Sequence, residues 1–158
     1  MKEMTSTVRD LFDKQVGLES RNALFYLNAS AEAARLGYPG FEKRWKDQAK
    51  DEFHHATKFM REAARLSVGP LNYWPLPMKF ERGTMVEVAE AAAAAEEETE
   101  EAMAEMIRVC EESCPAAAAW VSDRMADQSA ETKSAADMAQ AVREASASNT
   151  LSLLDREA

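Results

Sequence analysis

A carboxylate and an imidazole stand three residues apart, at Glu52 and His55, within a helix that we predict to run uninterrupted over Trp45–Leu66. Side chains at positions i and i+3 project from the same face of a helix. Glu19 lies further upstream, part-way along another predicted helix. If Glu19 faces the pair, the three groups form a pocket of oxygen and nitrogen ligands inside a helix bundle. That ligand set is typical of half of a carboxylate-bridged di-iron site.

The composition favours the long helices that would position these groups. The chain has 158 residues, which suits one domain with a normal core, and only five glycines and five prolines. Helix breakers gather at three places: Gly37–Gly40, Gly69–Gly83 and Ser113–Pro115. We therefore predict a single domain over residues 1–158, with helices at about 5–36, 41–67, 84–112, 115–147 and 150–157.

Local signals indicate where these helices begin and end. Gly37-Tyr38-Pro39-Gly40 ends the first helix, and Gly69-Pro70 stops the second. Thr84, with Glu87 three residues on, has the pattern of a capping box at the start of the third. Pro115 suits the first position of the fourth helix. Ser148-Asn149-Thr150 is expected to cap the last one.

The connection between the second and third helices, about residues 68–83, sets the topology. Sixteen extended residues reach about 50 Å, whereas a helix of 27 residues is about 40 Å long. The connection can therefore cross the full length of a bundle, while the other two turns are short enough for antiparallel hairpins. We predict an all-α, four-helix bundle with one long crossover and a short fifth C-terminal helix, which is the ferritin-like arrangement.

Counting residues from the turns locates the other half of the site. Glu19 lies 17 residues before the first turn and Glu52 lies 12 residues after it, so both sit at a similar depth in the bundle. The same count on the third and fourth helices gives Glu96, and then Asp127 or Gln128. The site would lie between all four helices.

Helical phase favours Glu96 within the acidic run 96–101. From Glu96, apolar residues follow one helical face in both directions. That face comprises Met85, Val88, Ala89, Ala92, Thr99, Met103, Met106 and Cys110. Glu97 and Glu100 remain the alternatives, and a solvated acidic surface is the plain explanation for the rest of the run.

The fourth helix offers Gln128-x-x-Glu131 as the counterpart of Glu52-x-x-His55, with Asp127 beside it. A second Glu-x-x-His is absent, so the two halves of the site would differ. Tyr26 lies two helical turns beyond Glu19 on the same face. A phenol there could hydrogen-bond a ligand or donate an electron, and it fits equally well as an ordinary buried tyrosine.

Charge and cysteine content exclude several classes of function. The net charge of −9 repels nucleic acid. No run of about 18 apolar residues could span a membrane, and residues 1–5 form no apolar signal region, so we expect a cytoplasmic protein. Cys110 and Cys114 stand four residues apart on one predicted helix, which suits a disulfide badly, and we expect both to be reduced.

These motifs resemble those of the prokaryotic non-haem ferritins over nearly the whole chain. The residues that carry the resemblance are Val16-Gly17-Leu18-Glu19 with Phe25-Tyr26, Asp51-Glu52-Phe53-His54-His55, Asp127-Gln128-x-x-Glu131, and the final Leu151-Ser-Leu-Leu-Asp155-Arg156-Glu157. The helix motif around Glu52 is moderately specific, and its combination with the C-terminal segment is strongly so.

The resemblance implies a homo-oligomeric cage of twenty-four subunits, without haem, that oxidises Fe(II) with dioxygen or peroxide and stores it as a ferric mineral. It implies a ferroxidase centre with Glu19, Glu52 and His55 at one iron, Glu52 bridging, and Glu96, Gln128 and Glu131 at the other. Tyr26 matches an electron donor beside the centre. Asp51 and Asp127 match a third iron position.

Two alternatives stay open at this point. A rubrerythrin-like di-iron peroxidase usually carries more histidine ligands and often a Cys-x-x-Cys module. A structural helical bundle would have no competent metal centre at all. A bacterioferritin fits less well, because it would need a second Glu-x-x-His and a methionine where this chain has Phe53.

Overall fold

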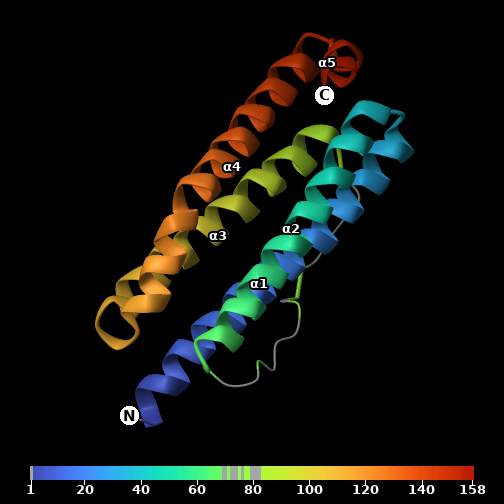
Figure 1. Ribbon diagram of the computed structural model, residues 1–158. Helices are drawn as coiled ribbons and strands as arrows, with labels where there is room; N and C mark the ends of the chain where they lie inside the picture. The colour runs from blue at the N-terminus through green and yellow to red at the C-terminus, as the bar shows by residue number, and fades with distance from the viewer. Residues whose placement is uncertain (1, 69–70, 72–74, 76, 79–82) are drawn as a thin grey trace.

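The computed structural model describes residues 2–68, 71, 75, 77–78 and 83–158, and side chains from residue 7 onward. The described residues form five α-helices (Figure 1). These are α1 (Lys2–Leu36), α2 (Pro39–Arg65), α3 (Met85–Ser113), α4 (Pro115–Ala147) and α5 (Leu151–Glu157). No helix among them is long and apolar enough to cross a membrane.

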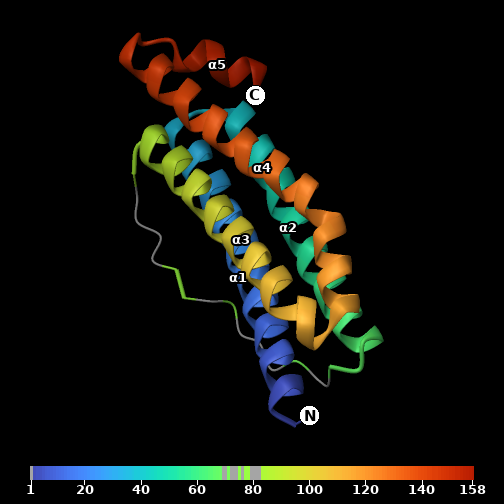
Figure 2. The ribbon, with the colours of Figure 1, turned by 90° about the vertical axis from the view of Figure 1, so that its left-hand side faces the viewer.

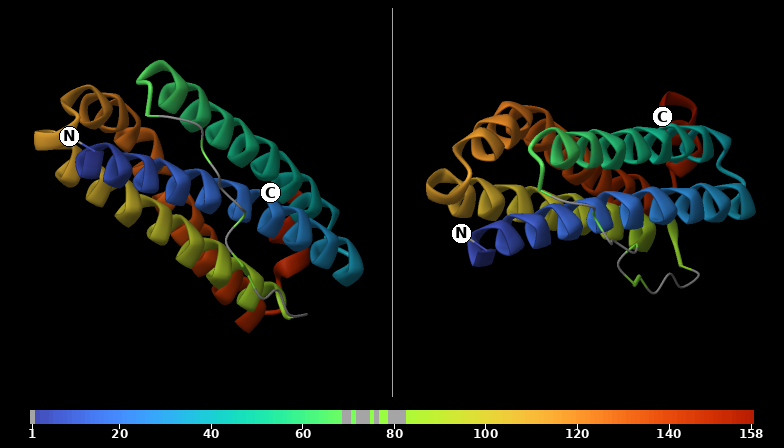
Figure 3. Two further views of the ribbon diagram at one scale, coloured as in Figure 1. Left: turned by 90° about the horizontal axis from the view of Figure 1, so that it is seen from below. Right: turned by 60° about the horizontal axis from the view of Figure 1, so that its bottom comes forward.

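The four long helices form two antiparallel hairpins, α1 with α2 and α3 with α4, and α1 also packs on α3 (Figures 1 and 3). The end of α2 lies beside the start of α1, where the rings of Phe12 and Phe59 are 6.3 Å apart. Gly83, just before α3, lies at the other end of α1, where its carbonyl accepts from Arg35 Nη2 at 3.5 Å. The chain therefore crosses the length of the bundle between α2 and α3, which confirms the predicted fold class.

The first turn is tighter than we predicted, because α2 begins at Pro39 rather than at residue 41. Gly37 adopts a left-handed backbone with φ of 84°, and the Tyr38 N–H donates to the Ala33 carbonyl at 2.9 Å. This is the glycine-based helix ending known as a Schellman motif. Pro39 then occupies the first turn of α2, where a missing N–H costs nothing.

α2 ends two residues before the predicted boundary at residue 67. The helix ends at Arg65, because Ser67 takes the left-handed conformation and the Val68 N–H returns to the Ala63 carbonyl at 3.1 Å. Gly69 and Pro70 lie outside the described residues. A serine therefore ends this helix with the geometry that sequence rules assign first to glycine.

The caps of α3 and α4 agree with the sequence, and that of α5 does not. Thr84 and Glu87 form both hydrogen bonds of the capping box, and Pro115 is the first residue of α4. Thr150 precedes α5 but makes no side-chain cap there. Asn149, with φ of 57°, instead ends α4 in the same way as Ser67 ends α2.

Two apolar clusters fill the two ends of the bundle. One surrounds Phe12, Phe59 and Val121, and the other surrounds Phe25, Phe41 and Val142. The apolar face predicted around Glu96 is buried throughout. Leu24 and Leu27 are exceptions to this burial, since both are more than 40% exposed on one flank of α1.

Both cysteines are free thiols, as expected. Cys110 is buried on α3, and burial raises its pKa to about 11. Cys114 lies between α3 and α4 rather than within one helix with Cys110, because α3 ends at Ser113.

The C-terminal helix lies across the end of the bundle and holds α2 through Asp155 (Figure 2). The Phe41 N–H, in the first turn of α2, donates to Asp155 Oδ1 at 2.9 Å. A Cβ on Gly40 would come within 1.8 Å of the Asp155 carbonyl oxygen, so only glycine permits this approach. Asp155 therefore caps α2 from a distant part of the chain.

We predict that Asp155→Ala will destabilise the subunit by about 1–2 kcal/mol, the range of a lost helix cap. Urea unfolding at one protein concentration measures it. Glu157→Ala is the matched control, because Glu157 is an exposed acid on the same short helix. Equal stability of the two variants would contradict the capping role of Asp155.

Candidate metal centre

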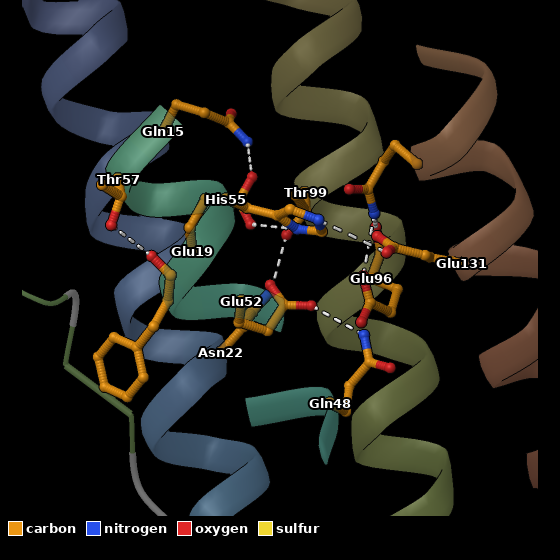
Figure 4. Close-up of polar contacts among 12 residues, drawn as sticks. Gln15, Glu19, Asn22, Gln48, Glu52, His55, Thr57, Glu96, Thr99 and Glu131 are labelled. Atoms are coloured by element: carbon orange, nitrogen blue, oxygen red, sulfur yellow. Dashed lines mark hydrogen bonds and ion pairs between the residues drawn. The ribbon is translucent and has the colours of Figure 1, made fainter. Parts of the chain in front are cut away.

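A layer of buried polar side chains separates the two apolar clusters, and each long helix contributes to it (Figure 4). Glu19 on α1 is 1% exposed, Glu52 on α2 is fully buried, and Glu96 on α3 is 1% exposed. Gln128 on α4 is buried with them, while His55 and Glu131 are half-buried. The structure therefore brings together all six residues that the sequence predicts as ligands.

The potential ligand atoms fall into two overlapping clusters, each with its atoms within 4.8 Å of one another. Glu19, Glu52 and His55 form the first, and Glu52, Glu96 and Glu131 form the second. Glu52 belongs to both. A carboxylate shared in this way has the position required to bridge two metal ions.

His55 lies between the two clusters. Its Nδ1 is 3.7 Å from Glu19 Oε2, and its Nε2 is 3.7 Å from Glu131 Oε1. Burial alone would lower the pKa of an imidazole, but the interaction with Glu19, and secondarily with Glu131, raises the pKa of His55. Without a metal, His55 thus acts as a local counter-charge for two carboxylates.

Glu96 is held by two donors. Tyr26 Oη donates to Glu96 Oε1 at 2.6 Å, and Gln128 Nε2 donates to Glu96 Oε2 at 2.9 Å. Burial first, and then the charge of Glu96, raises the pKa of Tyr26 well above its usual value. Tyr26 is therefore a neutral phenol that contacts a predicted ligand, and Gln128 remains a predicted ligand that here supports Glu96.

Two carboxylate oxygens in the layer lack any hydrogen-bond partner among the described residues. They are Glu19 Oε2 and Glu52 Oε2, both fully buried. A buried, ionised carboxylate without a partner costs several kcal/mol. Buried carboxylate oxygens that accept no hydrogen bond are expected in a metal site, where a cation would be their partner.

Burial and mutual repulsion raise the pKa values of three acids in this layer. Burial, together with the charges of Glu96 and Glu19, raises the pKa of Glu52 well above its usual value. Burial also raises the pKa of Glu96. The pKa of Glu131 rises to about 7, mainly through burial. Protons therefore take the place of cations in the metal-free layer.

The layer is closed between α1 and α3. Asn22 Nδ2 donates to Thr99 Oγ1 at 2.8 Å across the two helices. Arg21 covers this bond from outside, with its guanidinium donating to Asn22 Oδ1 at 3.1 Å and pairing with Glu98 at 2.8 Å. A hydrogen bond and an ion pair therefore join α1 to α3 at the level of the layer.

The layer is open between α2 and α4. One small cavity there reaches Tyr26, Glu96 and Glu131, and a second reaches Glu19, His55 and Glu131. Glu131 borders both cavities, so any solute that enters from this side meets its carboxylate.

The alternatives considered from the sequence lie elsewhere. Glu97 is exposed, and Glu100 accepts a hydrogen bond from Ser129 at the edge of α4. Asp51 and Asp127 are exposed and join neither cluster, although Asp127 borders one cavity and the charge of Asp51 acts on Glu131. A third iron position at Asp51 and Asp127 stays a prediction.

Sequence reasoning missed the two amides that hydrogen-bond to predicted ligands, Gln15 and Gln48, and the Asn22–Thr99 bond that joins α1 to α3. The sequence does contain a signal for the two glutamines. Gln15 and Gln48 each precede a predicted ligand by four residues, which places an amide on the same helical face.

Comparison with known proteins agrees with the fold. The family profile described as "Ferritin: Ferritin-like domain" matches residues 9–145, most of the chain. The chain belongs to the ferritin-like domain family. No curated protein sequence matches it.

Solved ferritin structures share the fold of this family member. An open-pore ferritin from the archaeon Archaeoglobus fulgidus is 20% identical, with a TM-score of 0.88 over 96% of this chain and 94% of that one. A PmFTN variant soaked in iron is 19% identical, with a TM-score of 0.89 over 97% and 99%. At these identities the likeness establishes the fold alone.

The raised pKa of Glu131 predicts an unusual pH dependence of the metal-free protein. Between the ordinary carboxyl value of 4.5 and about 7, the folded subunit holds a proton that the unfolded chain releases. Stability should therefore fall as the pH rises through this window, by on the order of 2 kcal/mol. Denaturant unfolding of metal-free protein at about pH 5 and about pH 8 measures the slope.

Glu131→Gln should flatten this dependence, whereas Glu101→Gln, at an exposed acid of α3, should leave it unchanged. A bound divalent metal should reverse the slope, because metal displaces protons from its ligands. Metal-free protein whose stability rises between pH 5 and pH 7 would contradict this description of the layer.

Proposed function

We propose that the protein stores iron, and that it oxidises Fe(II) at a di-iron centre inside each subunit before depositing Fe(III) as a mineral. Membership of the ferritin-like family supports the storage function. The observation that carries the ferroxidase activity is the position of Glu52, buried and shared by two clusters of potential ligand atoms.

The charges support occupation by two ferrous ions. Glu19, Glu52, Glu96 and Glu131 supply four negative charges, which equal the charge of two Fe(II) ions, while Gln128, Tyr26 and a neutral His55 add none. Binding two divalent cations therefore neutralises a layer that otherwise retains protons. One Fe(II) ion would meet Glu19, Glu52 and His55, and the other Glu52, Glu96, Gln128 and Glu131.

The ligand types suit iron in both the ferrous and the ferric state. Carboxylates are hard anionic ligands suited to both Fe(II) and Fe(III), and one imidazole adds affinity for Fe(II). Loss of one electron from each of two Fe(II) ions supplies two electrons, which together with two protons from solvent reduce dioxygen to hydrogen peroxide, or hydrogen peroxide to two water molecules. Oxidation leaves two positive charges in excess of the four carboxylates, and hydroxide or oxide derived from water would balance them in the ferric product.

The open side of the layer suggests the route of exchange. Iron would enter and leave between α2 and α4, past Glu131, because hydrogen bonds close the α1–α3 side. Tyr26 contacts Glu96 at the second iron position and is placed to donate an electron there.

Assembly into a cage completes the proposal. Leu24 and Leu27 are 45% and 43% exposed on one flank of α1, and apolar side chains grouped at a surface favour burial against another subunit. A cage of twenty-four subunits would have a mass of about 420 kDa, twenty-four times the 17.5 kDa of one chain.

We predict that Glu52→Ala will slow the initial oxidation of Fe(II), followed as ferric absorbance, by more than about tenfold, since both metal positions lose a ligand. Glu97→Ala removes a neighbouring exposed acid of α3 and should oxidise iron at the wild-type rate. Glu52→Ala protein that oxidises iron as fast as wild type would contradict the ferroxidase centre.

Mass and iron content together separate the candidate functions. Size-exclusion chromatography with light scattering should give a particle near 420 kDa that retains far more than two iron atoms per subunit after aerobic loading. A small dimer with two irons per subunit would favour a rubrerythrin-like peroxidase instead. Protein that binds no iron would favour a structural bundle.

A further inference from the structure

Two glutamines stand in the same relation to two of the predicted ligands. Gln15 lies four residues before Glu19 on α1, and Gln48 lies four residues before Glu52 on α2. In both pairs the amide Nε2 donates to carboxylate Oε1, at 2.8 Å in the first and 3.1 Å in the second. In both pairs the other oxygen, Oε2, is buried and accepts no hydrogen bond among the described residues.

The unpartnered oxygens face the centre of the layer. Glu19 Oε2 is the atom that lies 3.7 Å from His55 Nδ1. Figure 4 shows Gln48 on one side of the Glu52 carboxylate and Glu19 with His55 on the other. Each glutamine thus occupies the outer oxygen of its carboxylate and leaves the inner oxygen available.

Packing does not explain Gln15. Its side chain is 1% exposed, and it lies on α1 between Phe12 and Glu19, at the boundary of an apolar cluster. A buried amide is costly unless it is hydrogen-bonded, and an apolar side chain of similar size would avoid that cost. The hydrogen bond to Glu19 gives this residue type its physical reason.

We propose that Gln15 and Gln48 are positioning residues, which hold Glu19 and Glu52 with Oε2 directed at the metal positions. This inference rests on the proposed di-iron function and adds to it. A glutamate side chain loses much rotamer freedom when it is fixed, and a ligand fixed beforehand does not lose that freedom on binding the ion. An amide supplies the donor without altering the balance of four carboxylates against two divalent ions.

The two glutamines should affect metal binding differently. Glu19 belongs to one cluster, so loss of Gln15 should weaken one metal position. Glu52 belongs to both clusters, so loss of Gln48 should weaken both. A merely structural role for either glutamine gives no reason for this difference between one site and two.

The chain provides its own control. Gln140 donates to Glu144 Oε1 at 2.9 Å, again four residues apart, on the exposed surface of α4. Gln140→Met therefore removes the same kind of pair away from the layer. Methionine keeps the length and flexibility of the side chain and removes the donor, so Gln15→Met and Gln48→Met leave packing nearly unchanged.

The test is an anaerobic titration of the whole metal-free protein with Co(II), followed by visible absorption and calorimetry. Wild type and Gln140→Met should bind two Co(II) ions per subunit with equal affinity. Gln15→Met should weaken one of the two sites by about 10–100-fold, the range for lost supporting hydrogen bonds. Gln48→Met should weaken both sites by a similar factor. Circular dichroism establishes whether each variant is folded. If Gln15→Met does not fold, Gln48→Met alone tests the proposal, because Gln48 is only half-buried.

The outcomes distinguish the two proposals. If wild type, Gln15→Met and Gln48→Met all bind two Co(II) ions with affinities within twofold of one another, the role of the glutamines is overturned and the metal centre stands. Wild type that binds no Co(II) would overturn the metal centre and the glutamine role with it.

Discussion

The constraint that governs this structure is the enclosure of four carboxylates, three buried and one half-buried, in the middle of a helical bundle. Each would cost several kcal/mol if it remained ionised without a partner. In the metal-free layer protonation reduces this cost, because the pKa values of Glu52, Glu96 and Glu131 are raised. Two divalent cations would meet the same cost and leave the layer neutral, so affinity for metal and instability of the ionised layer have one physical origin.

The rest of the fold can be understood as support for that layer. Apolar clusters on both sides hold the four helices together where the layer contributes little packing. Amide and phenol donors then fix the carboxylates on three helices. The Asn22–Thr99 bond joins α1 to α3, whereas α2 and α4 diverge around two small cavities. Rigidity on one side and access on the other follow from this difference.

Helical periodicity and turn counting were enough to predict the bundle, the long crossover and the choice of Glu96, because these depend on spacing along single helices. The same reasoning failed at the end of α2 and between α4 and α5, where Ser67 and Asn149 adopt left-handed conformations that sequence rules assign first to glycine. It also could not give a reason for Asp155, which caps a helix 114 residues away. Gln15 and Gln48 follow the i, i+4 rule but were not predicted, because a sequence shows which side chains could bind a metal and not which of them hydrogen-bond to one another.

The most direct test of the central claim is a crystal structure of the protein soaked anaerobically in Fe(II), with anomalous scattering recorded at the iron edge. Our account predicts two iron peaks per subunit inside the bundle, one against Glu19, Glu52 and His55 and the other against Glu52, Glu96 and Glu131, with Glu52 contacting both. Iron found solely at exposed acids such as Glu97 and Glu101, with the buried layer empty, would contradict it.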